Sequence, residues 1–216
     1  MSPDRRSDER STAASREETG PGMDPRIAVL LDKQEIREVV YRYCRGIDRR
    51  DLARVRDCYH PDASDRHGSF SGTVDEYLTW VDALLARYVW TMHLIANVIV
   101  ELEEPLDHAA VESYGVALHR SDEPRPHLNL ATGFRYLDHF ERRAGSWRIA
   151  SRVAVSEWSI RIPGDAWWPI PDSLPKGRRD ANDPLHDLLS SVAEAVERDG
   201  PTRARPRTDP SRESSE

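Results

Sequence analysis

The spacing of apolar residues along the chain changes once, from a helical to an alternating pattern, close to Trp90. Before Trp90, apolar side chains recur three and four residues apart, as they do on one face of a helix. After it they alternate in long runs, as they do in strands. Helices and strands in separate blocks predict an α+β fold, in which helices pack on one side of a mostly antiparallel sheet.

The helical block contains three predicted helices. The apolar face of the first comprises Ile27, Leu30, Leu31, Ile36, Val39, Val40, Tyr43 and Ile47. Gly46 is expected to mark its frayed end. Asp51 is a predicted N-cap for a short second helix that Pro61 ends. A loop rich in Asp, Ser and Gly follows, and a third helix is expected to start at Thr73 or Val74.

Four strands are predicted in the alternating block. The first spans residues 90–102 and has apolar residues on both faces, so we expect it to be covered on both sides. Residues 109–120, 130–142 and 146–162 give the other three strands.

The apolar residues concentrate in 26–162, which we predict to be one folded domain. Residues 1–25 and 200–216 contain too few apolar side chains to offset the entropy cost of ordering, so we predict disordered tails. The remaining segment, 163–199, is a Pro- and Trp-rich extension with a terminal helix. Its Trp167 and Trp168 are expected to pack over the domain, cover a pocket mouth or contact another subunit.

The composition excludes several classes of protein. With 31 Lys and Arg against 38 Asp and Glu, the formal net charge is -7, which does not favour nucleic-acid binding. No apolar run reaches the length of about 18 residues that spans a membrane, and no signal peptide is evident, so we expect a cytoplasmic protein. Cys44 and Cys58 are too few for a disulfide scaffold. The common nucleotide, hydrolase and zinc-protease motifs are missing, so we expect neither a cofactor nor a metal.

His93 is the residue most suggestive of chemistry. Alternation places it on one strand face with Ile95, Asn97 and Ile99, where burial would keep the imidazole neutral and able to accept a proton. Asp48 lies at the end of the first helix, where the helix dipole disfavours a carboxylate unless a partner such as His93 stabilises it. The alternatives are a core histidine bonded to a backbone carbonyl and a solvated aspartate in a turn.

Other polar residues could assist or have no chemical role. Three tyrosines at predicted buried or edge positions could donate a hydrogen bond to a substrate carbonyl, or simply belong to the core: Tyr43, Tyr59 and Tyr114. His119 ends the second strand, either at a pocket rim or in solvent. Asp62, Asp65 and His67 form a loose metal-binding pattern, but their loop is polar throughout and no fourth ligand has a defined spacing.

Several segments together form a familiar pattern. The first helix closes in Y-x-R-x-I-D-x-x-D-x-x-x-V from Tyr43, and C-Y-x-P-D-A follows from Cys58. T-M-H heads the first strand, and Y-x-D-x-F-E-R-x-x-G-x-W-R-I spans a hairpin. Over about residues 27–162, the chain resembles the SnoaL-like branch of the nuclear transport factor 2-like superfamily. The resemblance implies a conical α+β barrel, in which a strongly curved sheet wraps round a hydrophobic pocket closed by helices.

The resemblance also implies site residues. Scytalone and steroid dehydratases and a dehydrochlorinase of this kind use an Asp at the end of the first helix to orient a His on a strand, and Asp48 and His93 hold these positions here. Tyr43 stands where a residue assists at the substrate, and Tyr59 matches a tyrosine of the scytalone type. His119 takes the position of a further acid or histidine. The residues expected to bind substrate are Trp80, Asn97, Tyr114 and Arg152.

The resulting hypothesis is a cofactor-independent lyase or isomerase acting on an apolar polycyclic carbonyl compound of polyketide or steroid type. His93 would remove a proton next to the carbonyl, Tyr43 and Tyr59 would donate to its oxygen, and His119 would act as an acid. The alternatives are a polyketide cyclase and a non-catalytic binding or assembly module, such as a small subunit of ring-hydroxylating dioxygenases. We also expect a homodimer or small homo-oligomer.

Overall fold

A computed structural model describes residues 24–103, 106–121 and 128–199; the predicted tails lie outside these residues, except that a helix already begins at Pro25. The elements are α1 (Pro25–Arg49), α2 (Leu52–Asp57), β1 (Tyr59–His67), β2 (Phe70–Thr73), α3 (Val74–Leu85), β3 (Trp90–Glu103), β4 (His108–Arg120), β5 (Leu130–Arg143), β6 (Ser146–Arg161), η2 (Gly164–Ala166) and α4 (Pro184–Asp199). The strands form one sheet in the order β2-β1-β6-β5-β4-β3. Among the strands of the described residues, only β1 and β6 pair in parallel, so the predicted α+β fold with a mostly antiparallel sheet is confirmed.

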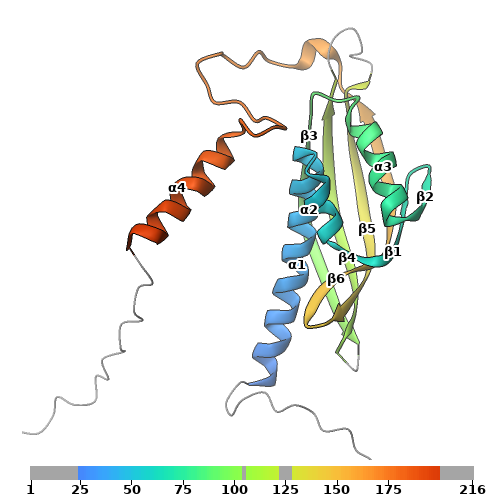
Figure 1. The fold of residues 1–216 in the computed structure, drawn as a ribbon. Coiled ribbons are helices and arrows are strands. Elements are labelled where there is room, and N and C mark those ends of the chain that lie inside the picture. The colour runs from blue at the N-terminus through green and yellow to red at the C-terminus, as the bar shows by residue number, and fades with distance from the viewer. Residues whose placement is uncertain (1–23, 104–105, 122–127, 200–216) are drawn as a thin grey trace, which may run out of the picture.

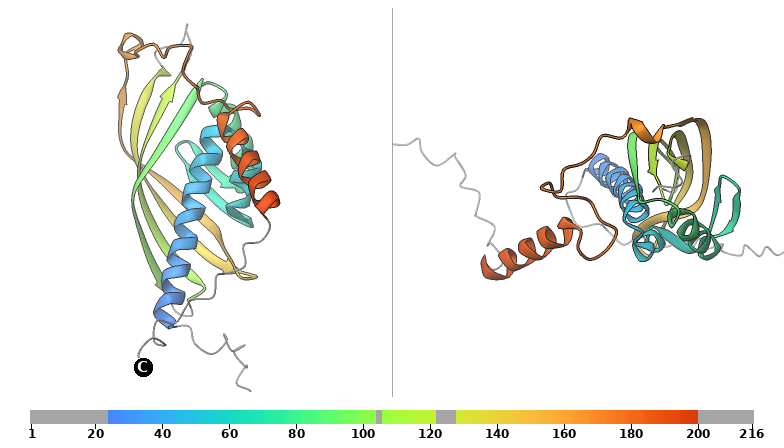
Figure 2. Two further views of the ribbon diagram at one scale, coloured as in Figure 1. Left: turned by 90° about the vertical axis from the view of Figure 1, so that its left-hand side faces the viewer. Right: turned by 90° about the horizontal axis from the view of Figure 1, so that it is seen from above.

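The sheet curls around the first three helices, which all lie on its inner side (Figures 1 and 2). One apolar cluster joins these helices to the inner face of the sheet, and its most deeply buried members include Val39, Tyr43, Val55, Tyr77 and Phe140. The result is the cone that the resemblance implies, with the helices closing its open side.

The helix α1 is longer than its apolar buried face. That face is buried from Ile36 to Ile47, as predicted. Ile27, Leu30 and Leu31, which the pattern assigns to the same face, are 48%, 64% and 56% exposed. The prediction is wrong for these first turns because this end of α1 meets the sheet through polar side chains.

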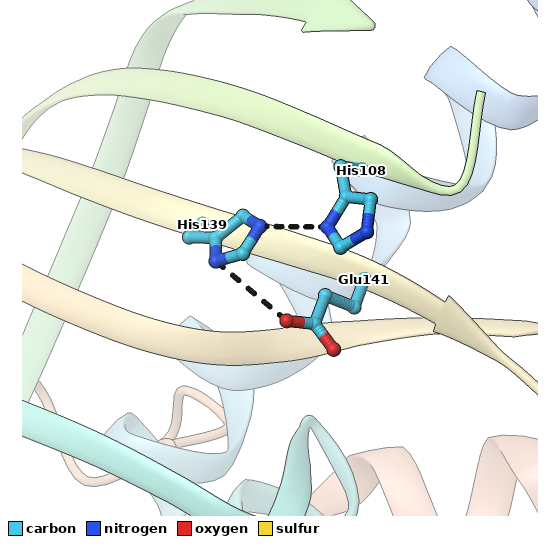
Figure 3. Close-up of side chains that lie close together, drawn as sticks. All are labelled: His108, His139 and Glu141. Carbon is cyan, nitrogen blue, oxygen red and sulfur yellow. Dashed lines mark hydrogen bonds and ion pairs between the residues drawn. The ribbon is translucent and has the colours of Figure 1, made fainter. Parts of the chain in front are cut away.

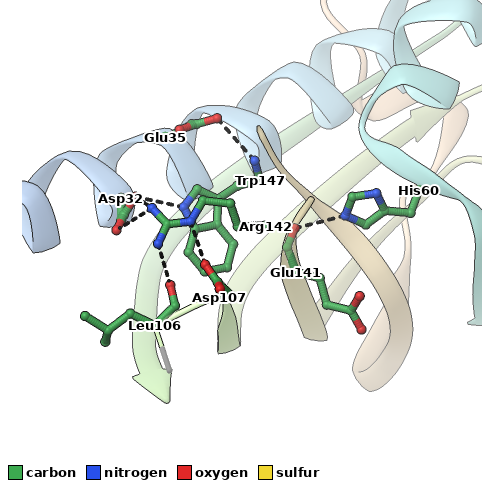
Figure 4. Close-up of polar contacts among 8 residues, drawn as sticks. All are labelled: Asp32, Glu35, His60, Leu106, Asp107, Glu141, Arg142 and Trp147. Atoms are coloured by element: carbon green, nitrogen blue, oxygen red, sulfur yellow. Dashed lines mark hydrogen bonds and ion pairs between the residues drawn. The ribbon is translucent and has the colours of Figure 1, made fainter. Parts of the chain in front are cut away.

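Figure 4 shows these polar contacts at the hairpin between β5 and β6. Asp32 of α1 accepts hydrogen bonds from Trp147 Nε1 at 2.9 Å and from Arg142 Nη1 at 3.0 Å. Arg142 also donates to Asp107 and to the carbonyl of Leu106, both at 2.9 Å. The buried indole of Trp147 therefore has the partner that its N–H requires.

Gly46 lies inside α1 instead of marking its end. A Cβ atom at this position would lie 2.7 Å from Val55 Cγ2 of α2. The missing side chain therefore allows α2 to pack closely against α1. The predicted N-cap of α2 is confirmed, because Asp51 accepts a hydrogen bond from a backbone N–H of the first turn at 3.0 Å.

Residues expected in a loop form β1 and β2 instead. α2 already ends at Asp57, and β1 starts at Tyr59 and continues through Pro61. The inward positions of β1 near its end belong to Asp65 and His67. Because both are polar, the sequence shows no alternation of hydrophobicity that would predict this strand.

The strand β3 is covered on one side only. Met92, Leu94 and Ile99 on its outer face are 49%, 54% and 47% exposed. The prediction of cover on both faces is wrong because the helices of the cone all lie on the inner side (Figure 2).

The segment after β6 crosses the upper end of the sheet in Figure 1 and leads to α4, which stands apart from the cone. Trp167 packs against Trp90 with ring centroids 5.2 Å apart, whereas Trp168 is 89% exposed. The predicted apolar stripe of α4 is at least 47% exposed at Leu188, Leu189, Val192 and Val196. None of the helices in the described residues is long and apolar enough to cross a bilayer.

Candidate functional site

Asp48 at the end of α1 and His93 near the start of β3 are in direct contact. The Nδ1–H of His93 donates to Asp48 Oδ1 at 2.7 Å, and the backbone N–H of His93 donates to Asp48 Oδ2 at 2.9 Å. Thr91 Oγ1 donates to Asp48 Oδ1 at 2.9 Å. Because a carboxylate can only accept, these bonds fix the proton on Nδ1 and leave Nε2 as the free basic nitrogen.

The surroundings keep Asp48 ionised. Burial alone would raise the pKa of Asp48, but the hydrogen bonds from the ring and backbone of His93 and from Thr91 outweigh it, and the pKa lies below its ordinary value. The His93 side chain is only 8% exposed. Its ring lies 5.9 Å from that of Phe134 on the inner face, and its Nε2 makes no hydrogen bond within the part of the chain that the structure describes.

Arg179, in the segment between β6 and α4, connects the Asp48–His93 dyad to the helices. Its guanidinium donates to the carbonyls of Asp48 at 3.1 Å, Leu85 at 3.1 Å and Tyr88 at 2.9 Å. It also donates to Thr91 Oγ1 at 3.0 Å, the hydroxyl that binds Asp48. One cation thus binds the carboxyl ends of α1 and α3, where a positive charge is favourable, and the start of β3 at Thr91.

We expect Arg179→Gln to raise the pKa of His119. Burial is the main reason that the pKa of His119 is lowered to about 4, and the nearby charge of Arg179 lowers it further. An NMR titration of His119 measures this change. Arg178→Gln, which removes the neighbouring exposed cation, should leave the titration as it is in the wild type. An unchanged pKa of His119 in the Arg179 variant would contradict the effect of the Arg179 charge on His119.

His119 differs from its expected role. It lies beside His93, with ring centroids 6.0 Å apart, and its buried Nδ1 has no hydrogen-bond partner among the described residues. With a pKa of about 4 it is uncharged at neutral pH. It can exchange hydrogen bonds with a ligand, but it does not provide a protonated acid.

Tyr43 and Tyr59 are both completely buried and already have partners. The hydroxyl of Tyr43 lies 2.5 Å from that of Tyr77, and Tyr59 donates to Asp65 Oδ2 at 2.6 Å. Burial raises the pKa of both phenols. A substrate would therefore have to displace these partners to receive a hydrogen bond from either tyrosine.

Arg152 is part of a buried ion pair. Its Nε and Nη2 each donate to Asp138 at 2.7 Å, and both side chains are fully buried. The guanidinium lies between the rings of Tyr43 and Tyr136, 4.1 Å and 4.0 Å from their centroids. Its Nη1 is the remaining donor, buried and without a partner in the described ranges.

Two predicted substrate-binding residues lie on the wrong face of the sheet. A bulge between Ile95 and Val98 interrupts the pairing of β3 with β4, so Asn97 is exposed and does not share the face of His93. Tyr114 is 39% exposed, with Arg135 over its ring. Strict alternation fails here because a bulge adds a residue to one strand.

The structure separates the residues of the loose metal-binding pattern, Asp62, Asp65 and His67. Asp62 points outward and pairs with Arg143 at 2.6 Å, whereas Asp65 and His67 face inward. Trp80, expected to bind substrate, is half-buried with its ring centroid 6.1 Å from that of His67. The sequence does not indicate that Asp65 and His67 face inward together, because it does not predict their strand.

A cleft of about 280 Å³ opens beside the dyad, along the seam between α1 and β3. Its lining comprises Tyr41, Cys44, Arg45, Asp48, Arg49, His93 and Ile95. This lining is more polar than the hydrophobic pocket that the resemblance implies, because two arginines form part of it.

Figure 3 shows one further group of possible metal ligands among the described residues, on the outer face of the sheet. His108 Nδ1 and His139 Nε2 lie 3.0 Å apart and share a hydrogen bond. Glu141 lies 3.8 Å from His139 and is ion-paired with Arg143 at 2.6 Å. Since these ligand atoms already bind one another or Arg143, we assign no metal to them.

Thr91 and Arg179 are the neighbours of the dyad that the sequence analysis did not identify. Thr91 lies two residues before His93 and therefore on the same strand face, so alternation could have found it. Arg179 lies in a segment without periodicity, and no local signal relates it to Asp48.

The chain is similar to several known proteins. An uncharacterized protein of Mycobacterium tuberculosis is 24% identical over 130 residues, which cover 59% of this chain and 86% of the relative. A scytalone dehydratase candidate from Novosphingobium aromaticivorans has a similar structure, with a TM-score of 0.58 and 18% identity over 63% of this chain and 91% of its own. A hexachlorocyclohexane dehydrochlorinase from Novosphingobium barchaimii gives a TM-score of 0.57 and 18% identity, covering 67% of this chain and 97% of its own.

These two structural similarities establish the fold alone, because both identities are low. The model of the SnoaL-like domain family, however, matches residues 28–153. This range includes α1 from its fourth residue onward, all of α2 and α3, five complete strands and both members of the dyad. The chain therefore belongs to the SnoaL-like family.

Proposed function

We propose that the protein is a cofactor-independent lyase or isomerase for an apolar polycyclic carbonyl compound of polyketide or steroid type. His93 is the general base, and Asp48 orients it. The observation that carries this proposal is a pair of hydrogen bonds from His93 to the Asp48 carboxylate. One comes from the ring Nδ1–H at 2.7 Å and the other from the backbone N–H at 2.9 Å, and they leave Nε2 unbonded.

In this mechanism, Nε2 removes a proton from the carbon next to the carbonyl, and the charge of Asp48 stabilises the imidazolium that forms. Trp80 supplies aromatic surface near the ring of His67, and Phe134 supplies it near the ring of His93. Tyr43 and Tyr59 act as donors where the substrate displaces their present partners. Asn97 and Tyr114 have no part in the proposal.

Proton exchange tests the proposed base without knowledge of the natural substrate. β-Tetralone, a bicyclic ketone with an acidic proton next to its carbonyl, is incubated with the protein in deuterated buffer. We expect its proton NMR signal to disappear faster than in buffer alone, and a panel of steroid and polyketide ketones then ranks the substrates. If no ketone exchanges faster than in buffer, the proposal is contradicted.

The exposed outer face of β3 supports a second candidate, an assembly module. Met92, Leu94 and Ile99 form an apolar surface that a second copy could cover, consistent with the expected homodimer. Light scattering tests the dimer. For a purely structural module, variants of His93 would keep full function and the chain would copurify with a larger partner.

A further inference from the structure

The end of β1 places a second carboxylate and imidazole together on the inner face. His67 Nδ1 lies 3.6 Å from Asp65 Oδ1. The Asp65 side chain is fully buried, and neither of these two atoms has a hydrogen-bond partner in the described residues. A buried polar atom without a hydrogen-bond partner lowers the stability of a fold. We therefore expect a ligand, a proton or a water molecule to satisfy these two atoms.

The charges around Asp65 do not balance without His67. Arg152 is Asp65's neighbour across the β1–β6 pairing, but its Nε and Nη2 both bind Asp138. Tyr59 gives Asp65 one hydrogen bond and no charge. Two buried carboxylates thus face one guanidinium, and a proton on His67 would neutralise the second carboxylate.

The His67 ring lies on the same inner face as the dyad. It packs against Tyr77 and Tyr136, with centroids 5.6 Å and 5.9 Å away, and its side chain keeps 26% exposure. The ring centroids of Tyr136 and Phe134 lie 4.6 Å apart, and the ring of Phe134 in turn packs against that of His93. A continuous row of ring contacts therefore connects the two imidazoles along the inner face.

We propose that Asp65 and His67 form a second imidazole–carboxylate pair, in which His67 is the catalytic acid that protonates the leaving oxygen of the substrate. This inference rests on the proposed function and completes it. His119 cannot take this role as an uncharged ring, so His67 is the inward histidine left to donate the proton.

The step balances without a further reactant. His93 takes the proton next to the carbonyl, and the electron pair of that C–H bond forms a carbon–carbon double bond. The β carbon–oxygen bond breaks, and the leaving oxygen takes a proton from His67 and departs as water. His93 has then gained one proton and His67 has lost one, and exchange with solvent restores both.

The two half-reactions can be measured separately. A β-hydroxytetralone, whose dehydration gives a fluorescent naphthol, reports elimination, and deuterium exchange of β-tetralone reports the base alone. We expect His67→Gln to lower elimination by about 10²-fold or more and to leave exchange at the wild-type rate. The control His139→Gln, on the outer face, should change neither reaction.

The outcomes separate the two proposals. Equal elimination by His67→Gln and wild type would overturn the role of His67 while the base remains. A wild type that catalyses neither reaction would overturn the proposed function and this inference with it.

A second measurement needs no substrate. In nitrogen NMR of histidine-labelled protein, we expect Asp65→Asn to shift the ring-nitrogen signals of His67 and to leave those of His139 unchanged. Unchanged His67 signals in this variant would contradict the proposed pair.

Discussion

Replacing His93 with alanine lowers the rate of ketone proton exchange by about 10²- to 10⁴-fold, the usual contribution of a positioned general base. The variant loses the free Nε2 and also the hydrogen bond from the ring to Asp48 Oδ1. The hydrogen bond from the backbone N–H of residue 93 to Asp48 Oδ2 remains. The measurement is the deuterium exchange of β-tetralone, followed by proton NMR.

Two further variants sharpen this result. Asp48→Asn should reduce the rate of exchange. An amide has only one accepting oxygen for the two hydrogen bonds from His93, and it has no negative charge to stabilise the imidazolium that His93 forms. Asn97→Ala alters an exposed residue of the same strand and should exchange at the wild-type rate. A His93→Ala protein that remains folded and exchanges like the wild type would contradict the assigned base.

Replacing Arg152 with methionine lowers the free energy of unfolding by about 3–5 kcal/mol, because Asp138 is then left as a buried charge without its partner. Both side chains of the pair are fully buried, so solvent does not compensate for the loss. The midpoint and slope of urea unfolding measure the change.

The double variant Arg152→Met with Asp138→Leu distinguishes the charge effect from lost packing. Because it removes both charges, we expect it to recover most of the stability lost in the single variant. If Arg152→Met were as stable as the wild type, the description of Arg152 and Asp138 as a buried ion pair would be contradicted.

The helices and long strands could be predicted because their sequences agree at several levels. The face from Ile36 to Ile47 has helical spacing, and Asp51 combines capping chemistry with the right position. The contact between Asp48 and His93 was also predicted, from the end of one helix and the face of one strand. Their chemical roles remain proposals.

The rest could not be predicted because it depends on tertiary structure. β1 has Asp65 and His67 at inward positions, so the usual alternation of hydrophobicity is missing. The bulge after Ile95 moves Asn97 to the outer face. Arg179 reaches the carbonyl of Asp48 from 131 residues away, a relation that no local pattern encodes.

A crystal structure of the protein soaked with β-tetralone tests the central claim most directly. We predict that the ketone binds on the inner face against Phe134, with the carbon next to its carbonyl within about 3.5 Å of His93 Nε2. Ketone bound only outside the cone, or an Nε2 atom directed away from every bound ligand, would contradict the account.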